Sequence, residues 1–132
     1  MIVPYTDLPA QTGGDPRPLV DVQVADMDDA LVPCLVDSGS VHSLLPRWVA
    51  DAAGLALSDD RKRNLAVAGT STRATFVPVD LTVAGLNWEA DVGFCDPWPY
   101  VWGLLGQRSF FRFFTVTFRA VDFEFQLAPL QS

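Results

Sequence analysis

One carboxylate stands at an unusual position, directly after an apolar segment. Residues 31–36 are almost continuously apolar, and Asp37-Ser38-Gly39-Ser40 follows at once. A charged side chain at the end of a buried strand costs desolvation unless it is hydrogen-bonded, and Gly39 allows the backbone to turn its N–H groups toward the carboxylate. Asp-Ser/Thr-Gly arises by chance in about one chain in twenty of this length. The triplet alone therefore fits either a polar turn or a reactive carboxylate.

The elements expected to position this carboxylate are short strands. Apolar and polar residues alternate in residues 19–25, which predicts a strand with one buried face, and residues 31–36 predict a buried strand that returns antiparallel to it. Short helices are expected near residues 46–53 and 107–113. Further strands are expected at 65–68, 74–79, 81–83, 88–94, 101–105, 115–118 and 123–127. Many short strands separated by turns predict a mostly β fold, a barrel or a sandwich.

The chain length of 132 residues suits one domain with a sizeable core. Residues 4–18 contain four prolines and the Gly13-Gly14 pair, a composition typical of an extended segment. We therefore expect a Pro/Gly-rich arm over residues 1–18 and a single domain over residues 19–132.

Composition and charge exclude several classes of function. Hydrophobic residues make up 49% and charged residues 19% of the chain, which indicates a globular protein. The net charge of -7 argues against a nucleic-acid partner, because phosphate binding needs a concentrated positive surface. The longest apolar run, residues 110–118, is interrupted by Arg112 and is too short to cross a bilayer. The N-terminus lacks the pattern of a signal peptide, so a cytoplasmic location without a membrane partner is expected.

Two cysteines and one histidine offer no set of ligands for a Cys/His zinc site. We expect no metal and no cofactor. Cys34 and Cys95 are expected to be buried, reduced thiols.

The triplet gains meaning from two later segments. A polar hairpin tip is expected around Ala68, Gly69 and Thr70, and Leu104-Leu105-Gly106 opens the second short helix. In this order the three parts resemble the retropepsin-like aspartic peptidases, in particular the bacterial members. The resemblance runs from about residue 20 to residue 127. It implies a retropepsin-like acid-protease barrel of a single lobe and an aspartic-type endopeptidase activity.

The resemblance also implies roles for individual residues. Asp37 matches the catalytic aspartate, Ser38 the hydroxyl residue that ties two active-site loops together, and Gly39 the turn glycine. Leu104, Leu105 and Gly106 match the strand that passes behind the catalytic loop. The remaining matches are the flap over substrate, at Ala68, Gly69 and Thr70, and the pocket and loop positions of His42 and Ser40.

Aspartic peptidases need two carboxylates that share one proton, since two like charges so close together cannot both ionise. This chain has one Asp-Ser/Thr-Gly triplet. The resemblance therefore implies a homodimer in which two copies of Asp37 face each other across a twofold axis, with an extended polypeptide as substrate.

Some positions depart from the retroviral pattern. Val41 and His42 occupy positions where the retroviral enzymes carry acidic residues that hold the substrate backbone. Ser40 offers a hydroxyl that could donate to Asp37 and lower its pKa, which predicts an acidic optimum. The terminal strands of the retroviral dimer have no obvious counterpart in the Pro-rich arm, whereas the Phe-rich hairpin near the C-terminus could replace them.

Three interpretations remain open at this stage. The first is an active homodimeric endopeptidase. The second is a catalytically inactive module of the same fold that binds peptide or dimerises, and the third is an accidental triplet in an unrelated β-barrel. His42 fits either a substrate pocket or an ordinary half-buried position. Trp98, Tyr100 and Trp102 fit either specificity pockets or packing.

Overall fold

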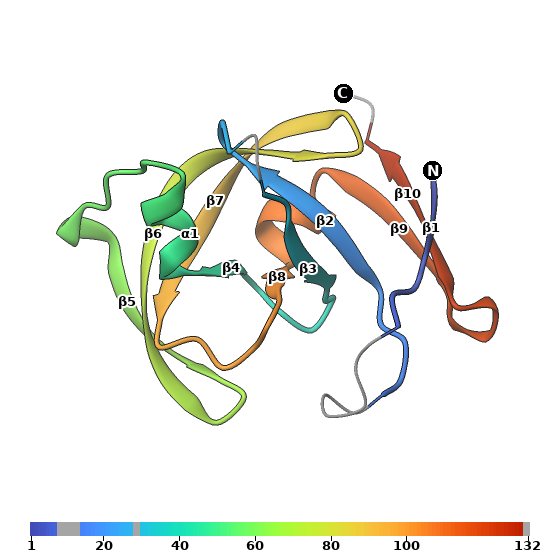
Figure 1. The fold of residues 1–132 in the computed structure, drawn as a ribbon, viewed down its shortest axis with the longest axis horizontal. Coiled ribbons are helices and arrows are strands. Elements are labelled where there is room, and N and C mark those ends of the chain that lie inside the picture. The colour runs from blue at the N-terminus through green and yellow to red at the C-terminus, as the bar shows by residue number, and fades with distance from the viewer. Residues whose placement is uncertain (8–13, 28–29, 131–132) are drawn as a thin grey trace.

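The computed structural model describes residues 1–7, 14–27 and 30–130. Short strands dominate these residues (Figure 1). In chain order the elements are β1 (Ile2–Pro4), β2 (Leu19–Val24), β3 (Val32–Val36), β4 (Ser43–Pro46), α1 (Arg47–Ala52), η2 (Asp59–Arg61), β5 (Lys62–Val67), β6 (Thr70–Val83), β7 (Leu86–Asp96), β8 (Gly103–Leu105), η3 (Gln107–Phe111), β9 (Phe114–Arg119), η4 (Ala120–Asp122) and β10 (Glu124–Pro129).

The larger sheet closes on itself. Its strand order is β2-β3-β8-β4-β7-β6-β5, and a second pairing joins β2 to β6. This pairing involves Gln23 with Thr82 and Val24 with Leu81. The ring β2-β3-β8-β4-β7-β6 is therefore a barrel, and β5 extends it beyond the closure. A mostly β barrel with short helices, as expected from the sequence, is confirmed.

The barrel encloses the main core because alternate residues of its strands point inward. In β2, Val20, Val22 and Val24 are buried while Asp21 is exposed. Phe94 of β7 and Phe110 of η3 are among the largest fully buried side chains. A second, smaller cluster lies beside the barrel where the β5–β6 hairpin packs. Its buried members are Leu44, Val67, Ala74, Phe76, Cys95 and Leu104.

A separate three-stranded sheet has the order β1-β10-β9. Ile2 pairs with Gln126, and Phe125 pairs with Phe118, both in antiparallel register. The residues at 2–4 thus form a strand of the sheet, although the composition of the first 18 residues predicts an extended arm. Residues 8–13 of that arm lie outside the described part of the chain. The hairpin of β9 and β10 agrees with the strands expected near the C-terminus.

Most elements lie where the sequence places them. The helix expected at 46–53 is α1, and the one expected at 107–113 is the short π-helix η3. The two strands expected at 74–79 and 81–83 are one continuous strand, β6, because Asp80 pairs with Glu89 without a break. The short strands β1 and β4 were not expected.

Both cysteines are free and buried, as expected. Burial raises the pKa of Cys95 to about 12, and it raises the pKa of Cys34 further, so both thiols stay protonated near neutral pH. Within the described ranges no helix has the length and apolar character needed to cross a membrane.

Candidate functional site

Asp37 is the first residue after β3, and the parallel strand β8 lies beside it. Leu35 pairs with Leu104 and Val36 with Leu105, and the Asp37 N–H donates to the carbonyl of Leu105 at 3.0 Å. The Gly39 N–H donates to Oδ1 of Asp37 at 2.9 Å, and the Ser40 N–H donates to the Asp37 carbonyl at 3.2 Å. The carboxylate is half-buried and is held by the turn that its own loop makes.

The segment after β8 supports this loop from behind. The Gln107 N–H donates to the Ser40 carbonyl at 2.8 Å, and the Gln107 side-chain amide donates to the Ser38 carbonyl at 2.7 Å. The Gly106 N–H donates to the buried Ser43 hydroxyl at 3.0 Å. Leu104, Leu105 and Gly106 therefore lie against the Asp37 loop. Gln107 was not singled out in the sequence, because a single glutamine after a glycine carries no recognisable pattern.

Gly106 is required by a close approach of two backbones. A Cβ at this position would lie 2.6 Å from the carbonyl oxygen of Ser40 and would also overlap the carbonyl oxygen of His42. Only a residue without a side chain lets the β8–η3 segment pass so near the loop.

Ser40 does not make the expected hydrogen bond to Asp37. Its hydroxyl donates instead to the carbonyl of His42 at 2.6 Å. A hydroxyl has a single proton to donate, so the bond to His42 leaves none for the carboxylate. The hydrogen bond on which the expected acidic optimum depends is therefore not made in this chain. Ser40 acts within the loop as a structural residue.

A cavity of about 300 Å³ opens above the Asp37 carboxylate. It lies between the Asp37 loop and the hairpin of β5 and β6. Its lining residues are Asp37, Gly39, Ser40, Val41, His42, Leu44, Leu65, Ala66, Val67, Ala68, Tyr100 and Leu104. Asp37 is the one carboxylate among these described residues, and His42 and Tyr100 are the other lining residues that can exchange a proton.

The hairpin tip reaches the cavity through fewer residues than expected. Ala68 lines the cavity, whereas Gly69 and Thr70 do not. Ala68 and Gly69 both have positive φ, 49° and 75°, as a two-residue hairpin turn of the I′ type requires. Left-handed backbone is costly for alanine, so the tip is strained at the residue that faces the cavity. Leu65 and Val67 were missed, although their alternation along the hairpin indicated a buried face.

His42 lies at the edge of the cavity and is half-buried. Its ring meets the Phe76 ring edge to face, with 5.0 Å between the centroids. Burial lowers the pKa of His42, and the positive charges of Arg108 and Arg63 lower it further. The imidazole is therefore neutral at neutral pH.

The other expected site residues take supporting positions. The Ser38 side chain is exposed in the single chain, next to the carbonyl that Gln107 holds. Trp98, Tyr100 and Trp102 pack against the smaller core cluster, and the Trp98 indole N–H donates to the Trp102 carbonyl at 2.8 Å. Tyr100 alone of the three also lines the cavity. The aromatic group thus serves packing first.

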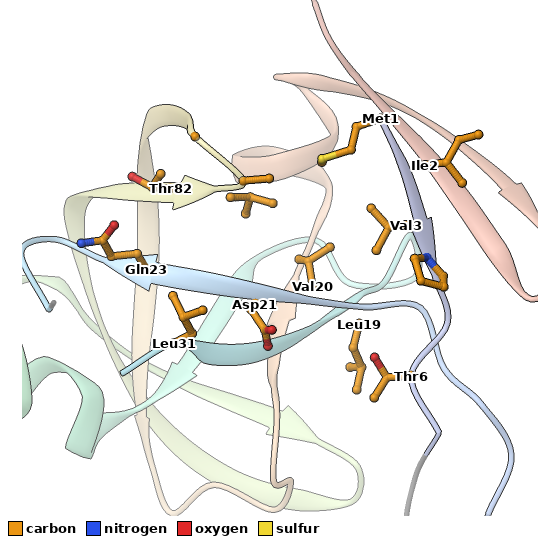
Figure 2. A pocket seen from close by; sticks show the side chains of 14 residues that line it. Met1, Ile2, Val3, Thr6, Leu19, Val20, Asp21, Gln23, Leu31 and Thr82 are labelled. Atoms are coloured by element: carbon orange, nitrogen blue, oxygen red, sulfur yellow. The ribbon is translucent and has the colours of Figure 1, made fainter. Parts of the chain in front are cut away.

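A larger cavity, of about 610 Å³, lies elsewhere, between β1, β2 and the β6–β7 turn. Figure 2 shows the side chains of Met1 and Val3 on the cavity side of the N-terminal strand, while Ile2 points to the other side. Its lining is mainly apolar, and Asp21 is the single carboxylate among the described lining residues. Catalysis needs polar groups that converge on one point, so the smaller cavity at Asp37 is the better candidate despite its size.

The described residues include no group of three or more His, Cys, Asp or Glu side chains that could hold a metal ion. One chain thus brings a single held carboxylate to the base of a cavity beneath a hairpin. Comparison with protein-family models finds none that matches the chain, and comparison with curated proteins finds no match either.

Proposed function

We propose that two copies of this chain form an aspartic endopeptidase, in which Asp37 of each copy contributes one carboxylate to a shared dyad. The observation that carries the proposal is the placement of Asp37. It follows a buried strand, it accepts the Gly39 N–H at 2.9 Å, and it lies in a cavity roofed by the β5–β6 hairpin. The resemblance of the triplet and of Leu104-Leu105-Gly106 to the retropepsin-like peptidases supports the same activity.

The chemistry requires the second carboxylate. In the dyad the two Asp37 side chains share one proton, and the ionised one accepts a proton from a water molecule as its oxygen attacks the scissile carbonyl. The protonated one donates a hydrogen bond to the carbonyl oxygen. The tetrahedral intermediate then collapses as the C–N bond breaks and the leaving nitrogen takes a proton.

Two features of the C-terminal region support a dimer. Strands β1 and β9 are the outer strands of the three-stranded sheet, so each has an edge at which a further strand could pair. The β9–β10 hairpin also exposes apolar side chains near its turn, with Val121 at 88% and Phe123 at 56% exposure. In Figure 1 the loop after β3 lies between this hairpin on one side and the β5–β6 hairpin on the other.

The cavity suits an extended polypeptide. Leu65, Val67, Leu44 and Leu104 give it an apolar lining, and the hairpin above offers backbone groups for strand-like pairing with a peptide. No ion or cofactor is needed for this chemistry.

The test combines cleavage with mass in solution. The protein is incubated with a denatured protein mixture between pH 3 and pH 7, together with Asp37→Asn and the control Asp80→Asn, which removes an exposed carboxylate far from the cavity lining. Cleavage by the unchanged chain and by Asp80→Asn but not by Asp37→Asn supports the proposal. A strictly monomeric protein at high concentration, or a dimer without cleavage at any pH, refutes it. A dimer that cleaves nothing but still binds extended peptide would instead support the alternative of an inactive binding module.

Mixing the two chains tests the shared dyad directly. If each active site uses one Asp37 from each copy, random pairing of equal amounts of wild type and Asp37→Asn leaves about one quarter of the dimers with both carboxylates. Activity should then fall to about one quarter of that of the same total amount of wild type. A fall to one half would show that each chain works alone.

A further inference from the structure

A further cavity, of about 260 Å³, adjoins the Asp37 cavity at His42 and is lined by arginines. Its lining residues are His42, Arg61, Arg63, Phe76, Asp91, Arg108, Ser109 and Arg112. Four of the nine basic residues of the chain gather here, although the whole chain carries a net charge of -7. Such a local reversal of charge needs a physical explanation.

One of the four arginines is already neutralised. Arg61 forms two hydrogen bonds with the Asp91 carboxylate, at 2.9 and 2.8 Å. Among the residues that the structure describes, Arg63, Arg108 and Arg112 form no salt bridge. Three positive charges therefore face one cavity without an anion to balance them.

The hydroxyl of Ser109 beside the arginines also lacks a hydrogen-bond partner among the described residues. Ser109 is buried at 2% exposure and lines the cavity. A buried hydroxyl without a partner is costly, so the wall of this cavity carries an unsatisfied polar group beside the arginines. The Arg63 guanidinium lies over the Phe76 ring, 5.6 Å from its centroid, which orients the charge at the cavity wall.

His42 connects this cavity to the Asp37 cavity, because it lines both. Phe76, which lines the arginine cavity, packs against the His42 imidazole with 5.0 Å between the ring centroids. A polypeptide that extends from Asp37 past His42 would bring a side chain to the arginines, since alternate residues of an extended chain point to opposite sides.

We infer that the arginine-lined cavity binds an acidic side chain of the polypeptide that occupies the Asp37 cavity, and so selects substrates with carboxylates near the scissile bond. This inference rests on the proposed function for its substrate, but the anion site itself does not depend on cleavage. Guanidinium groups bind carboxylates through paired, charge-assisted hydrogen bonds, which neutral side chains cannot form. The acidic chain as a whole repels such a substrate, so the attraction has to be local.

Two peptides and two matched variants test the inference. The peptides are decapeptides with the same apolar centre and with either Glu or Gln on both flanks, and all proteins carry Asp37→Asn so that no peptide is cut. We expect the Glu peptide to bind about 10-fold more tightly than the Gln peptide, the ratio that one charge-assisted hydrogen bond provides. Arg63→Gln with Arg108→Gln should abolish this preference. The control, Arg17→Gln with Arg119→Gln, removes two exposed charges that do not line either cavity and should retain it.

A spectroscopic readout locates the bound carboxylate. The chain has a single histidine, so one imidazole signal in the NMR spectrum reports on His42. A carboxylate beside the ring favours the imidazolium form, so the Glu peptide should raise the pKa of His42 above its value with the Gln peptide. Equal His42 titration with the two peptides would overturn the inference, as would equal affinity, or a preference lost equally in both double variants.

The two proposals fail separately. A Glu preference that depends on Arg63 and Arg108, in a protein whose wild type cuts nothing, would leave the anion site standing and refute the peptidase. Cleavage that depends on Asp37 but shows no Glu preference would do the reverse.

Discussion

Replacing Gly106 with alanine should disrupt the contact on which the Asp37 loop rests. The added Cβ would lie 2.6 Å from the Ser40 carbonyl oxygen and 2.8 Å from the His42 carbonyl carbon, both of them backbone atoms that no rotamer change can move. Overpacking of this kind costs about 1–3 kcal/mol.

The hydrogen bonds around Gly106 increase this cost. Relief of the overlap requires the loop and η3 to separate, which lengthens the bonds from the Gln107 N–H to Ser40 and from the Arg108 N–H to Val41, now 2.8 and 3.0 Å. Each such bond contributes about 1 kcal/mol. The expected loss is therefore about 3–5 kcal/mol, a large part of the roughly 5–15 kcal/mol that stabilises a typical domain.

Urea unfolding followed by tryptophan fluorescence measures this loss. Gly39→Ala is the matched control, because its Cβ would meet a single neighbour, Oδ1 of Asp37 at 3.2 Å, and should cost less than about 1 kcal/mol. Equal stability of the two variants, or a loss below 1 kcal/mol for Gly106→Ala, would show that the β8–η3 segment does not rest on the loop as described.

Three further predictions concern the hairpin tip, the thiols and the histidine. Ala68→Gly should stabilise the chain by about 0.5–1 kcal/mol in urea unfolding, because the relief of left-handed strain, about 1–2 kcal/mol, exceeds the added entropy cost of glycine. Ala84→Gly, in the equivalent turn with φ 48°, should stabilise the chain equally without altering peptide cleavage. A lack of stabilisation in either variant would contradict the turn geometry. Cys34 and Cys95 should not react with a thiol reagent at pH 8 in the folded protein and should both react in urea, since burial raises both pKa values; fast reaction of the native protein would disprove their burial. His42 has a lowered pKa in the folded chain, so the unfolded chain binds more protons below the ordinary value of 6.5; its contribution to stability is complete above that pH and decreases as the pH falls through the folded value. The loss of stability between pH 7.5 and pH 5 should thus be smaller for His42→Gln than for the wild type, and an identical loss would contradict the shift.

The sequence predicted the elements whose pattern is local. Alternation in residues 19–25 located β2, the apolar run before Asp37 located β3, and Pro46 with Gly54 bounded α1 to within a residue or two. Local pattern also placed Asp37 at a strand end, whereas the role of Leu104-Leu105-Gly106 beside it was implied only by the resemblance. These features depend on neighbours in the chain.

Features that depend on distant neighbours were not predictable. The strand β4 has four residues, and its existence follows from parallel pairing with β7 and a single pairing with β8. The sequence could assign the Ser40 hydroxyl a partner, Asp37, only because the two residues are close in the chain. In the structure the hydroxyl donates to the His42 carbonyl instead. The arginine-lined cavity unites residues from β5, β7 and η3, which nothing in a linear reading brings together.

The continuity of β6 links the roof of the candidate cleft to the seam of the barrel. One strand of 14 residues begins at the hairpin tip and ends where Thr82 and Leu81 meet β2. Among the described residues the seam consists of those two residue pairs and the Ala25 N–H, which donates to the Asp80 carbonyl at 2.8 Å, whereas β6 pairs with β7 over eleven residues. Because β6 has no break that could act as a hinge, we expect a displacement of its tip to twist the strand along its whole length. If a polypeptide enters beneath the tip, the displacement would reach this short seam, and the Ala25 amide is the one whose hydrogen exchange would record it.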